Sequence, residues 1–456
     1  MTVAKNPTVE TRKFSATLLK DSFRSVRWST QGRVRQVVGT IIEASLPGIQ
    51  LGTISEIQIT GRSDRVLAEV VGFTKDGFTQ LLPYSHLNGV FPGSLITPLA
   101  TYTTVPVGDF LIGRVVDAFM NPLDGAPLDL TKANHFQELD APAPSPLERQ
   151  RIRNELSLGV RAIDGLLTFG EGQRLGIMAG SGVGKSVLMG MIAKDSAADV
   201  NVIGLVGERG REVREFIERD LGAAGLARSV VVTVTSDQSP LMRVRAAKVT
   251  TAIAEYFSMR GAKVMLMLDS LTRVAMAQRE IGNSIGEPPT TKGYTPSVFS
   301  LLPKLLERAG PQREGHGPIS ALYTVLVDGD DFNDPIADAA RSTLDGHINL
   351  TRELATRNHF PAIDITTSSS RVMNDIVDRE HWEVAGRFKS LMGVYQENID
   401  LVQIGAYQPG SNPRLDEAIS LMPLMERYLR QDMNIHCTAH EALEQLHRVL
   451  QGLPLK

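Results

Sequence analysis

The sequence is poor in several features that define whole classes of protein. Cys437 is its only cysteine, so no intramolecular disulfide can form, and this favours a reducing compartment. No apolar run approaches the ~18 residues that a membrane-spanning helix needs. The first residues contain no apolar signal segment. We therefore expect a cytoplasmic protein that does not itself span a membrane.

Net charge and aromatic side chains are also limited. The net charge is −3 and aromatic residues make up 5% of the chain, so no basic, aromatic-rich surface points to nucleic acid as a partner. The chain has 456 residues, of which 42% are apolar and 22% charged. These values are typical of a globular protein with two to four domains.

The beginning of the chain is polar, but four apolar side chains recur there at helical spacing. Phe14, Leu18, Leu19 and Phe23 would form one apolar stripe on a helix. We predict an amphipathic extension over residues 1–32. It could pack on its own chain or dock on a partner protein, and the residues alone favour neither.

Residues 33–104 contain short β-branched runs that alternate with turn signals. Such regular short strands predict a small β-barrel. The segment carries no cluster of cysteine, histidine or carboxylate side chains, so we expect it to serve assembly rather than chemistry. The runs are residues 34–42, 54–59 and 66–73.

A proline-rich connector at residues 140–146 precedes a region in which apolar strands alternate with helical runs. This alternation predicts a mostly parallel sheet covered by helices on both faces. Ligands of such sheets lie outside the carboxyl ends of the strands. The predicted strands are residues 200–207, 229–236, 263–270 and 319–328.

Beyond residue 379 helix formers replace β-branched residues, and we predict a helical C-terminal domain over residues 379–456. Thr438 and Glu441 have the spacing of a capping box, which predicts a final helix over residues 441–450. His436 and His440 are four residues apart. A cap at Thr438 would leave His436 outside the helix, so this pair does not favour a metal site.

The strongest chemical signal is residues 175–189, where an apolar run enters a glycine-dense turn and a helical run leaves it. Glycines let backbone N–H groups gather around phosphate oxygens at the start of a helix. We predict that Lys185 binds the β- and γ-phosphates and that the Ser186 hydroxyl binds Mg²⁺. The predicted nucleotide-binding residues of this loop are Gly180, Ser181, Gly182, Val183, Gly184, Lys185, Ser186 and Val187.

Ala179 stands where this loop motif has its first glycine. Alanine resists positive φ, so the chain must enter the loop in a conventional conformation, but the N–H donors are unchanged. The alternative is a glycine-rich turn that only caps a helix, and a strand before the turn with a helix after it disfavours that interpretation.

Two carboxylates follow apolar strands at the same sheet edge. Asp269 is placed to hold the metal, and it could also be the N-cap of a helix from Leu271. Glu208 could orient a water molecule towards the γ-phosphate, or it could be an ordinary first-turn carboxylate. Its neighbour Arg209 could pair with Glu208 or contact phosphate.

The stretches 180–186, 207–213 and 269–273 together resemble the catalytic subunits of rotary ATPases and their relatives. Two further stretches are similar to the type III secretion ATPases, and within that family they resemble the flagellar branch most. The first comprises residues 275–282 and 286–299, and the second comprises residues 323–331, 335–338 and 344–348.

This resemblance implies a RecA-like P-loop ATPase domain over residues 105–378 and a homohexameric ring that binds ATP and Mg²⁺ between subunits. It implies that Glu208 is the catalytic carboxylate. Arg371, which alone would be interpreted as a solvated side chain, would reach into the site of the neighbouring subunit. Phe360 matches an aromatic that packs on adenine, with a core phenylalanine as the alternative. The predicted catalytic residues are Lys185, Glu208, Arg209 and Arg371, and the predicted metal ligands are Ser186 and Asp269.

The resemblance also implies a function: ATP hydrolysis that energises protein export through the flagellar type III apparatus. The implied partners are a stator-like regulatory protein on residues 1–32, a stalk-like coiled-coil protein in the ring pore, and a membrane export gate that holds the protein peripherally at the inner membrane. Exported proteins and their chaperones complete the set. The loop 287–296 and the acidic turn 328–331 could line the pore or a subunit interface, or could be ordinary turns.

The main alternative function is a virulence-type, or injectisome, type III secretion ATPase. An ion-pumping rotary subunit is disfavoured by residues 286–299, and an RNA-translocating hexamer by the scarcity of aromatic residues. A nucleotide switch that does not hydrolyse ATP is disfavoured by Glu208.

Overall fold

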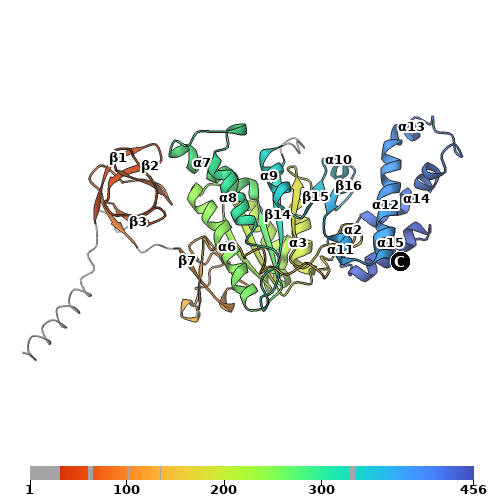
Figure 1. Ribbon diagram of the computed structural model, residues 1–456, viewed down its shortest axis with the longest axis horizontal. Coiled ribbons are helices and arrows are strands. Elements are labelled where there is room, and N and C mark those ends of the chain that lie inside the picture. Colours follow the sequence, from red (N-terminus) through yellow and green to blue (C-terminus); the bar gives the residue numbers. More distant parts are fainter. Residues whose placement is uncertain (1–30, 60–64, 100–102, 134, 328–333, 456) are drawn as a thin grey trace, which may run out of the picture. The chain divides into compact units, whose positions relative to one another are not determined.

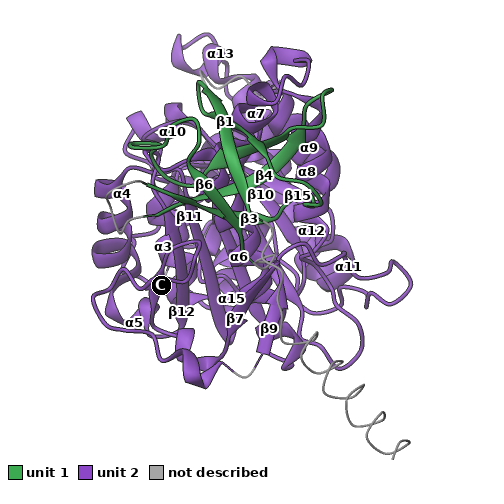
Figure 2. Cartoon of the chain, turned by 90° about the vertical axis from the view of Figure 1, so that its left-hand side faces the viewer, with its two compact units in different colours: residues 1–102 green, residues 103–456 purple. Residues whose placement is uncertain are grey.

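The computed structural model describes residues 31–59, 65–99, 103–133, 135–327 and 334–455. The chain divides into two compact units, Met1–Tyr102 and Thr103–Lys456 (Figure 2). All but the last two residues of the predicted N-terminal extension, and the whole of the acidic turn 328–331, lie outside the described residues, so both stay predictions.

The first unit contains a closed six-stranded barrel with the strand order β1-β2-β5-β4-β3-β6, which confirms the predicted barrel. Alternate residues of β4 are buried, as expected when one face of each strand lines the barrel core. Ile42, Ile57, Leu81 and Ile96 fill that core. The strands are β1 (Gly32–Val38), β2 (Ile41–Ser45), β3 (Ile54–Gln58), β4 (Arg65–Phe73), β5 (Thr79–Pro83) and β6 (Leu95–Pro98).

The run 34–42 was predicted as one strand, and this was wrong. It forms the end of β1 and the start of β2, which pair as an antiparallel hairpin. Gly39 has a φ of 61° and supplies the left-handed conformation of the tight turn. A single glycine inside a β-branched run was the only signal of this turn.

The second unit is built on an eight-stranded sheet with the order β16-β15-β10-β14-β13-β11-β12-β8. Strands β14, β15 and β16 of this sheet are labelled in Figure 1. All neighbouring pairs are parallel except β15 and β16, so the predicted mostly parallel sheet is confirmed. The strands are β8 (Val115–Val116), β10 (Arg174–Ala179), β11 (Val200–Val206), β12 (Ser229–Val234), β13 (Val264–Asp269), β14 (Ile319–Leu326), β15 (Gly346–Leu350) and β16 (Ile363–Ser370). A separate two-stranded sheet joins β7 (Thr104–Val107) and β9 (His135–Glu138).

Every residue of β11, β12 and β13 is buried, because helices pack on both faces of a sheet of this kind. Helix α6 packs against these three strands, and α7 packs against β14. The helices up to β16 are α2 (Arg161–Leu166), α3 (Lys185–Asp195), α4 (Gly210–Glu215), the π-helical turn η3 (Phe216–Leu221), α5 (Gly222–Leu226), α6 (Pro240–Met259), α7 (Leu271–Ser284), α8 (Pro296–Leu306), α9 (Pro335–Thr343) and α10 (Arg352–Thr356).

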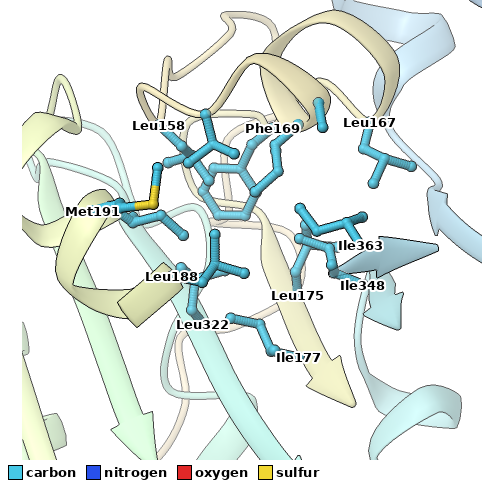
Figure 3. Close-up of a cluster of buried hydrophobic side chains, with 14 of the residues drawn as sticks. Leu158, Leu167, Phe169, Leu175, Ile177, Leu188, Met191, Leu322, Ile348 and Ile363 are labelled. Carbon is cyan, nitrogen blue, oxygen red and sulfur yellow. The ribbon is translucent and has the colours of Figure 1, made fainter. Parts of the chain in front are cut away.

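A cluster of buried apolar side chains holds α3 on the sheet (Figure 3). Leu188 and Met191 of α3 lie in this cluster with Phe169 and with Leu175 and Ile177 of β10. The strand before the glycine-rich turn and the helix after it are therefore packed into one rigid core, which fixes the position of the turn between them.

The chain after β16 is helical, as predicted, and consists of α11 (Met373–Ile376), α12 (Arg379–Glu397), α13 (Ile399–Gln403), α14 (Pro413–Leu429) and α15 (Ala439–Leu450). Tyr428 of α14 is fully buried and its hydroxyl donates to the carbonyl oxygens of Arg161 and Ala442. A methyl group at Gly165 of α2 would lie 2.0 Å from that hydroxyl, so only glycine permits this packing.

The capping box at Thr438 is confirmed, and it opens α15. His436 lies outside the helix, with its Nδ1 3.7 Å from Oδ1 of Asp195. Within the described ranges, no three histidine, cysteine or carboxylate side chains gather where they could hold a metal ion. None of the helices in those ranges combines the length and the apolar composition that a membrane crossing requires.

Candidate active site

Three strands of the sheet end at the same edge and present the candidate residues; β13 and β11 are neighbours, and β14 lies between β10 and β13. β10 runs into the glycine-rich loop, β13 ends at Asp269, and β11 leads to Glu208. Leu205 of β11 pairs with Asp269 across the parallel ladder, so the two strands end at the same level. The carboxyl edge of the sheet is therefore where the predicted phosphate loop and both carboxylates meet.

The glycine-rich loop after β10 contains backbone conformations that only glycine adopts readily. Gly182 and Gly184 have φ values of 79° and 91°, in the left-handed region that other residues rarely adopt. Gly184 is the N-cap of α3, which starts at Lys185 with Ser186 as its second residue. A helix start preceded by such glycines offers backbone N–H groups to an anion.

Lys185 lies between the two carboxylates. Its Nζ is 2.5 Å from Oδ1 of Asp269 and 3.6 Å from Oε1 of Glu208. All three side chains are mostly buried, and Asp269 is only 3% exposed. One cation thus faces two carboxyl groups in a site with little water, where electrostatic interactions are strong.

The pKa values of this cluster reflect its burial. Burial, with the negative charge of Asp269 as the next cause, raises the pKa of Glu208 to about 7. Burial alone would lower the pKa of Lys185, but the charges of Asp269 and Glu208 reverse this and raise it. Lys185 therefore stays protonated, whereas Glu208 exchanges its proton near neutral pH, where a general base is most effective.

Glu208 also has unused hydrogen-bonding capacity. Its Oε1 is buried, and no hydrogen-bond donor among the described residues satisfies it. Glu208 precedes Arg209, the N-cap of α4, so it is not a first-turn carboxylate of that helix; Glu212 is. A buried carboxylate oxygen without a donor is costly and is common where a ligand or water completes the arrangement.

The alternative that Asp269 caps α7 was wrong. The N-cap is Ser270, whose Oγ accepts a hydrogen bond from the N–H of Arg273 at 3.3 Å. Asp269 is one residue too early in the chain to be the cap, and its Oδ1 instead accepts from Lys185 Nζ and from the hydroxyl of Thr324, at 2.6 Å.

Two residues of this site were missed by reasoning from the sequence. Thr324 lies within β14, a mostly apolar strand that is buried except for its last residue, and nothing in the local sequence marks it as a site residue. Arg273 was noticed in a motif but given no role. Its stem packs beside Gly207, and its positive charge acts on Glu208 by lowering that residue's pKa against the larger effect of burial.

Arg209 does not join the buried cluster. Its Nη1 is 3.4 Å from Oε1 of Glu212, and 77% of its side chain is exposed. The pairing with Glu208 that was left open is therefore not formed, because the guanidinium points to the neighbouring turn of its own helix.

Arg371 lies at the opposite edge of the sheet from the phosphate loop. β16 runs antiparallel to β15, with Ile363 beside Leu350 at the carboxyl edge and Ser370 beside Gly346 at the other. Arg371 follows Ser370, is exposed, and donates from Nη2 to the carbonyl oxygen of Arg341 at 3.1 Å. It therefore cannot reach Lys185 of its own chain.

Phe360 lies against the phosphate loop. A methyl group at Gly184 would lie 3.3 Å from Cδ1 of Phe360, so the ring is adjacent to the start of α3. The ring is 41% exposed, which excludes the alternative of a core phenylalanine. An exposed aromatic face beside a phosphate loop can stack on a nucleotide base.

The residues at this edge fit a magnesium nucleotide. Ser186 and Asp269 offer the hydroxyl and carboxylate oxygens that Mg²⁺ prefers, and magnesium typically takes few protein ligands together with phosphate oxygens and water. The Oε1 of Glu208, which accepts no hydrogen bond from the described residues, and the glycine loop leave polar groups to which a nucleotide and water can bind.

Fold and site together define a nucleotide-binding domain of the ATP synthase type. The family model of the ATP synthase alpha/beta family, nucleotide-binding domain, matches residues 159–370. The model of the type III secretion EscN ATPase C-terminal domain matches residues 377–448.

Relatives narrow this class. A flagellum-specific ATP synthase of Bacillus subtilis strain 168 is 52% identical and aligns with 91% of this chain and 94% of its own. The assembled ATPase EscN of the enteropathogenic E. coli type III secretion system has a TM-score of 0.86 at 44% identity, covering 92% of this chain and 100% of EscN. EscN with its central stalk EscO gives 0.83 at the same identity and coverage. The chain belongs to the family of flagellar and type III secretion ATPases, and it is an ATPase.

Proposed function

We propose that this chain hydrolyses ATP with Mg²⁺ to energise protein export through the flagellar type III apparatus. The observation that carries the catalytic part is the placement of Lys185 between Asp269 and Glu208 at the ends of β13 and β11. The flagellar part is supported by the 52% identity to a flagellum-specific ATP synthase, against 48% to a type III secretion system ATPase.

In the proposed mechanism the N–H groups of residues 180–187 hold the phosphates, and Lys185 neutralises the β- and γ-phosphate oxygens. Ser186 and Asp269 would hold Mg²⁺, whose positive charge would stabilise the negative charge that develops on the phosphate oxygens. Glu208 orients the attacking water and takes its proton, for which its pKa of about 7 is suited. Phe360 contacts the base.

Arg371 would complete the pocket of a neighbouring copy, because it lies at the edge opposite to its own phosphate loop. We propose a homohexameric ring on this basis, and the assembled form named for EscN supports it. Arg209, which is exposed next to Glu208, would contact phosphate or the adjoining copy only in such a ring.

We propose further that the barrel over residues 33–104 serves ring assembly, while the segments 105–378 and 379–456 form the ATPase and C-terminal domains. A stalk-like protein in the pore is supported by the EscN complex with its central stalk. A stator-like protein bound by residues 1–32, peripheral attachment to a membrane export gate from the cytoplasm, and exported proteins with chaperones complete the proposed partners. The loop 287–296 lines the pore or a subunit interface in this scheme.

Steady-state phosphate release tests the catalytic proposal. Glu208→Gln should keep nucleotide binding while turnover falls by roughly 10² to 10⁴, the usual contribution of a positioned base. Normal turnover of this variant would remove Glu208 from the mechanism.

The virulence-type system is the second candidate, since EscN aligns with nearly the whole chain. Purification of the tagged full chain from its native cell distinguishes the two. Flagellar export components should accompany it, and injectisome components in their place would overturn the flagellar assignment.

A further inference from the structure

Gln431, in the loop between α14 and α15, has a side chain held on three sides. It is 7% exposed. Its Oε1 accepts from the N–H of Arg161 at 2.8 Å, and its Nε2 donates to the carbonyl oxygens of Gly159 at 2.8 Å and Ile435 at 2.7 Å. A buried amide with this many partners has one stable orientation.

The main chain of Gln431 continues this connection to the phosphate loop. Its N–H donates to the carbonyl oxygen of Phe360 at 2.9 Å. The ring of Phe360 in turn lies beside Gly184. A chain of direct contacts therefore leads from Gly159, through the Gln431 side chain and main chain, to the aromatic ring at the start of α3.

Arg161 holds the same C-terminal loop a second time. Its Nε donates to the carbonyl oxygen of Tyr428 at 2.7 Å, and its Nη1 to Oε1 of Gln445 at 2.5 Å. Because Arg161 anchors the end of α14 independently, loss of the Gln431 side chain should loosen the loop locally without detaching the helix.

We propose that Gln431 is a positioning residue that sets the affinity of the site for the nucleotide base. Its side chain fixes the loop whose N–H holds the Phe360 main chain, and this keeps the ring where a base can stack on it. The inference rests on the proposed contact of Phe360 with the base. It adds that the loop between α14 and α15 helps to hold Phe360 in the position for that contact.

The test separates base-dependent binding from phosphate binding. Gln431→Met removes three side-chain hydrogen bonds at nearly constant length, and the main-chain N–H remains. Calorimetry with the full chain and Mg²⁺ would compare ADP with inorganic tripolyphosphate, which has no base. The affinity for ADP should fall by roughly 5- to 30-fold, within the range of one base stack. The affinity for tripolyphosphate should change less than about twofold, and kcat at saturating ATP should be unchanged while KM rises.

Gln312→Met is the matched control. Gln312 is also 7% exposed, and its Nε2 donates to the carbonyl oxygens of Arg308 and Gly310. This variant also loses buried side-chain hydrogen bonds, but none of them leads to Gln431 or Phe360. The affinities for ADP and for tripolyphosphate should therefore stay unchanged.

Phe360→Ala should lower the affinity for ADP but not for tripolyphosphate, and adding Gln431→Met to it should cause no further loss of ADP affinity.

The outcomes separate the inference from the proposal beneath it. If Phe360→Ala leaves ADP binding unchanged, the base contact is wrong and the inference fails with it. If Phe360→Ala weakens ADP and Gln431→Met does not, only the inference fails. An equal loss for ADP and tripolyphosphate in Gln431→Met would mean a general structural effect and would also overturn it. Should Gln431→Met not fold, Gln431→Glu keeps the acceptor for Arg161 and loses the two donors, and the same comparison decides.

Discussion

At the scale of single residues, the site depends on one buried cation that faces two carboxylates. Lys185 contacts Asp269 more closely than Glu208, so Glu208 is the less compensated of the two acids. Its pKa of about 7 lies above the ordinary value of 4.5, which means that the folded chain without nucleotide favours the protonated form.

This shift makes a prediction about stability and pH. A raised carboxyl pKa contributes stability below about pH 4.5, and that contribution is lost as the pH rises through about 7. Glu208→Gln cannot ionise, so its free energy of unfolding relative to wild type should rise between pH 5 and pH 8. The upper limit is about 3 kcal/mol, from ~1.4 kcal/mol per pKa unit. Thermal melting of both chains without nucleotide at several pH values would measure it. A difference in melting temperature that does not vary with pH would contradict the assigned shift.

Thr324 supports a second prediction at this scale. Its hydroxyl holds Oδ1 of Asp269, which should keep the carboxylate in the orientation that the metal requires. Thr324→Val keeps the shape and removes that bond, and the affinity of ADP in the presence of Mg²⁺ should fall about tenfold. The affinity of ADP with EDTA should stay the same.

Thr324→Ser is the matched variant that retains the hydroxyl, and it should restore binding with Mg²⁺. An equal loss of affinity with and without the metal in Thr324→Val would show that Thr324 acts on packing rather than on Asp269.

At the scale of elements, the sequence predicted those features whose determining residues lie close together in the chain. The glycine loop, the four apolar strands and the capping box at Thr438 each lie in one short stretch, and each was predictable. The antiparallel edge pair of β15 and β16 was not, because strand pairing depends on partners distant in the chain. Thr324 was missed for the same reason: its partner Asp269 lies on a different strand.

The capping box gives the prediction at this scale. The Thr438 hydroxyl accepts from the N–H of Glu441, and the Glu441 carboxylate accepts from the N–H of Thr438. Thr438→Ala should destabilise α15 by about 1 kcal/mol, seen as faster amide exchange over residues 439–450. Thr356→Ala, which removes an exposed hydroxyl at the end of α10, should change the melting temperature little. Unchanged exchange in α15 would mean that packing alone holds this helix.

At the scale of the whole molecule, one chain does not bring all of the predicted catalytic residues together. Lys185, Glu208 and Asp269 meet at the carboxyl edge of the sheet, and Arg371 lies at the other edge. Sequence reasoning could name Arg371 only by resemblance, because the feature that gives it a role would be a second copy of the chain.

Mixed assemblies test this arrangement. Lys185→Ala and Arg371→Ala should each be inactive alone. Loss of Arg371 should lower kcat by roughly 10³ to 10⁵ if this residue acts as an arginine finger. A mixture of the two should regain activity, because some interfaces then pair an intact Lys185 with an intact Arg371. A mixture of Lys185→Ala and Glu208→Gln should stay inactive, since both changes damage the same side of the pocket. Inactivity of the first mixture in verified mixed rings would contradict a shared site.

The strand β16 has a consequence for how such sites communicate. Phe360 stands shortly before it, at the edge where the nucleotide would bind, and Arg371 directly follows its other end. A displacement of this strand along its own axis would move both residues at once. Nucleotide binding beside Phe360 would then move Arg371 in the pocket of the neighbouring copy, and the movement would be transmitted through the eight residues of β16.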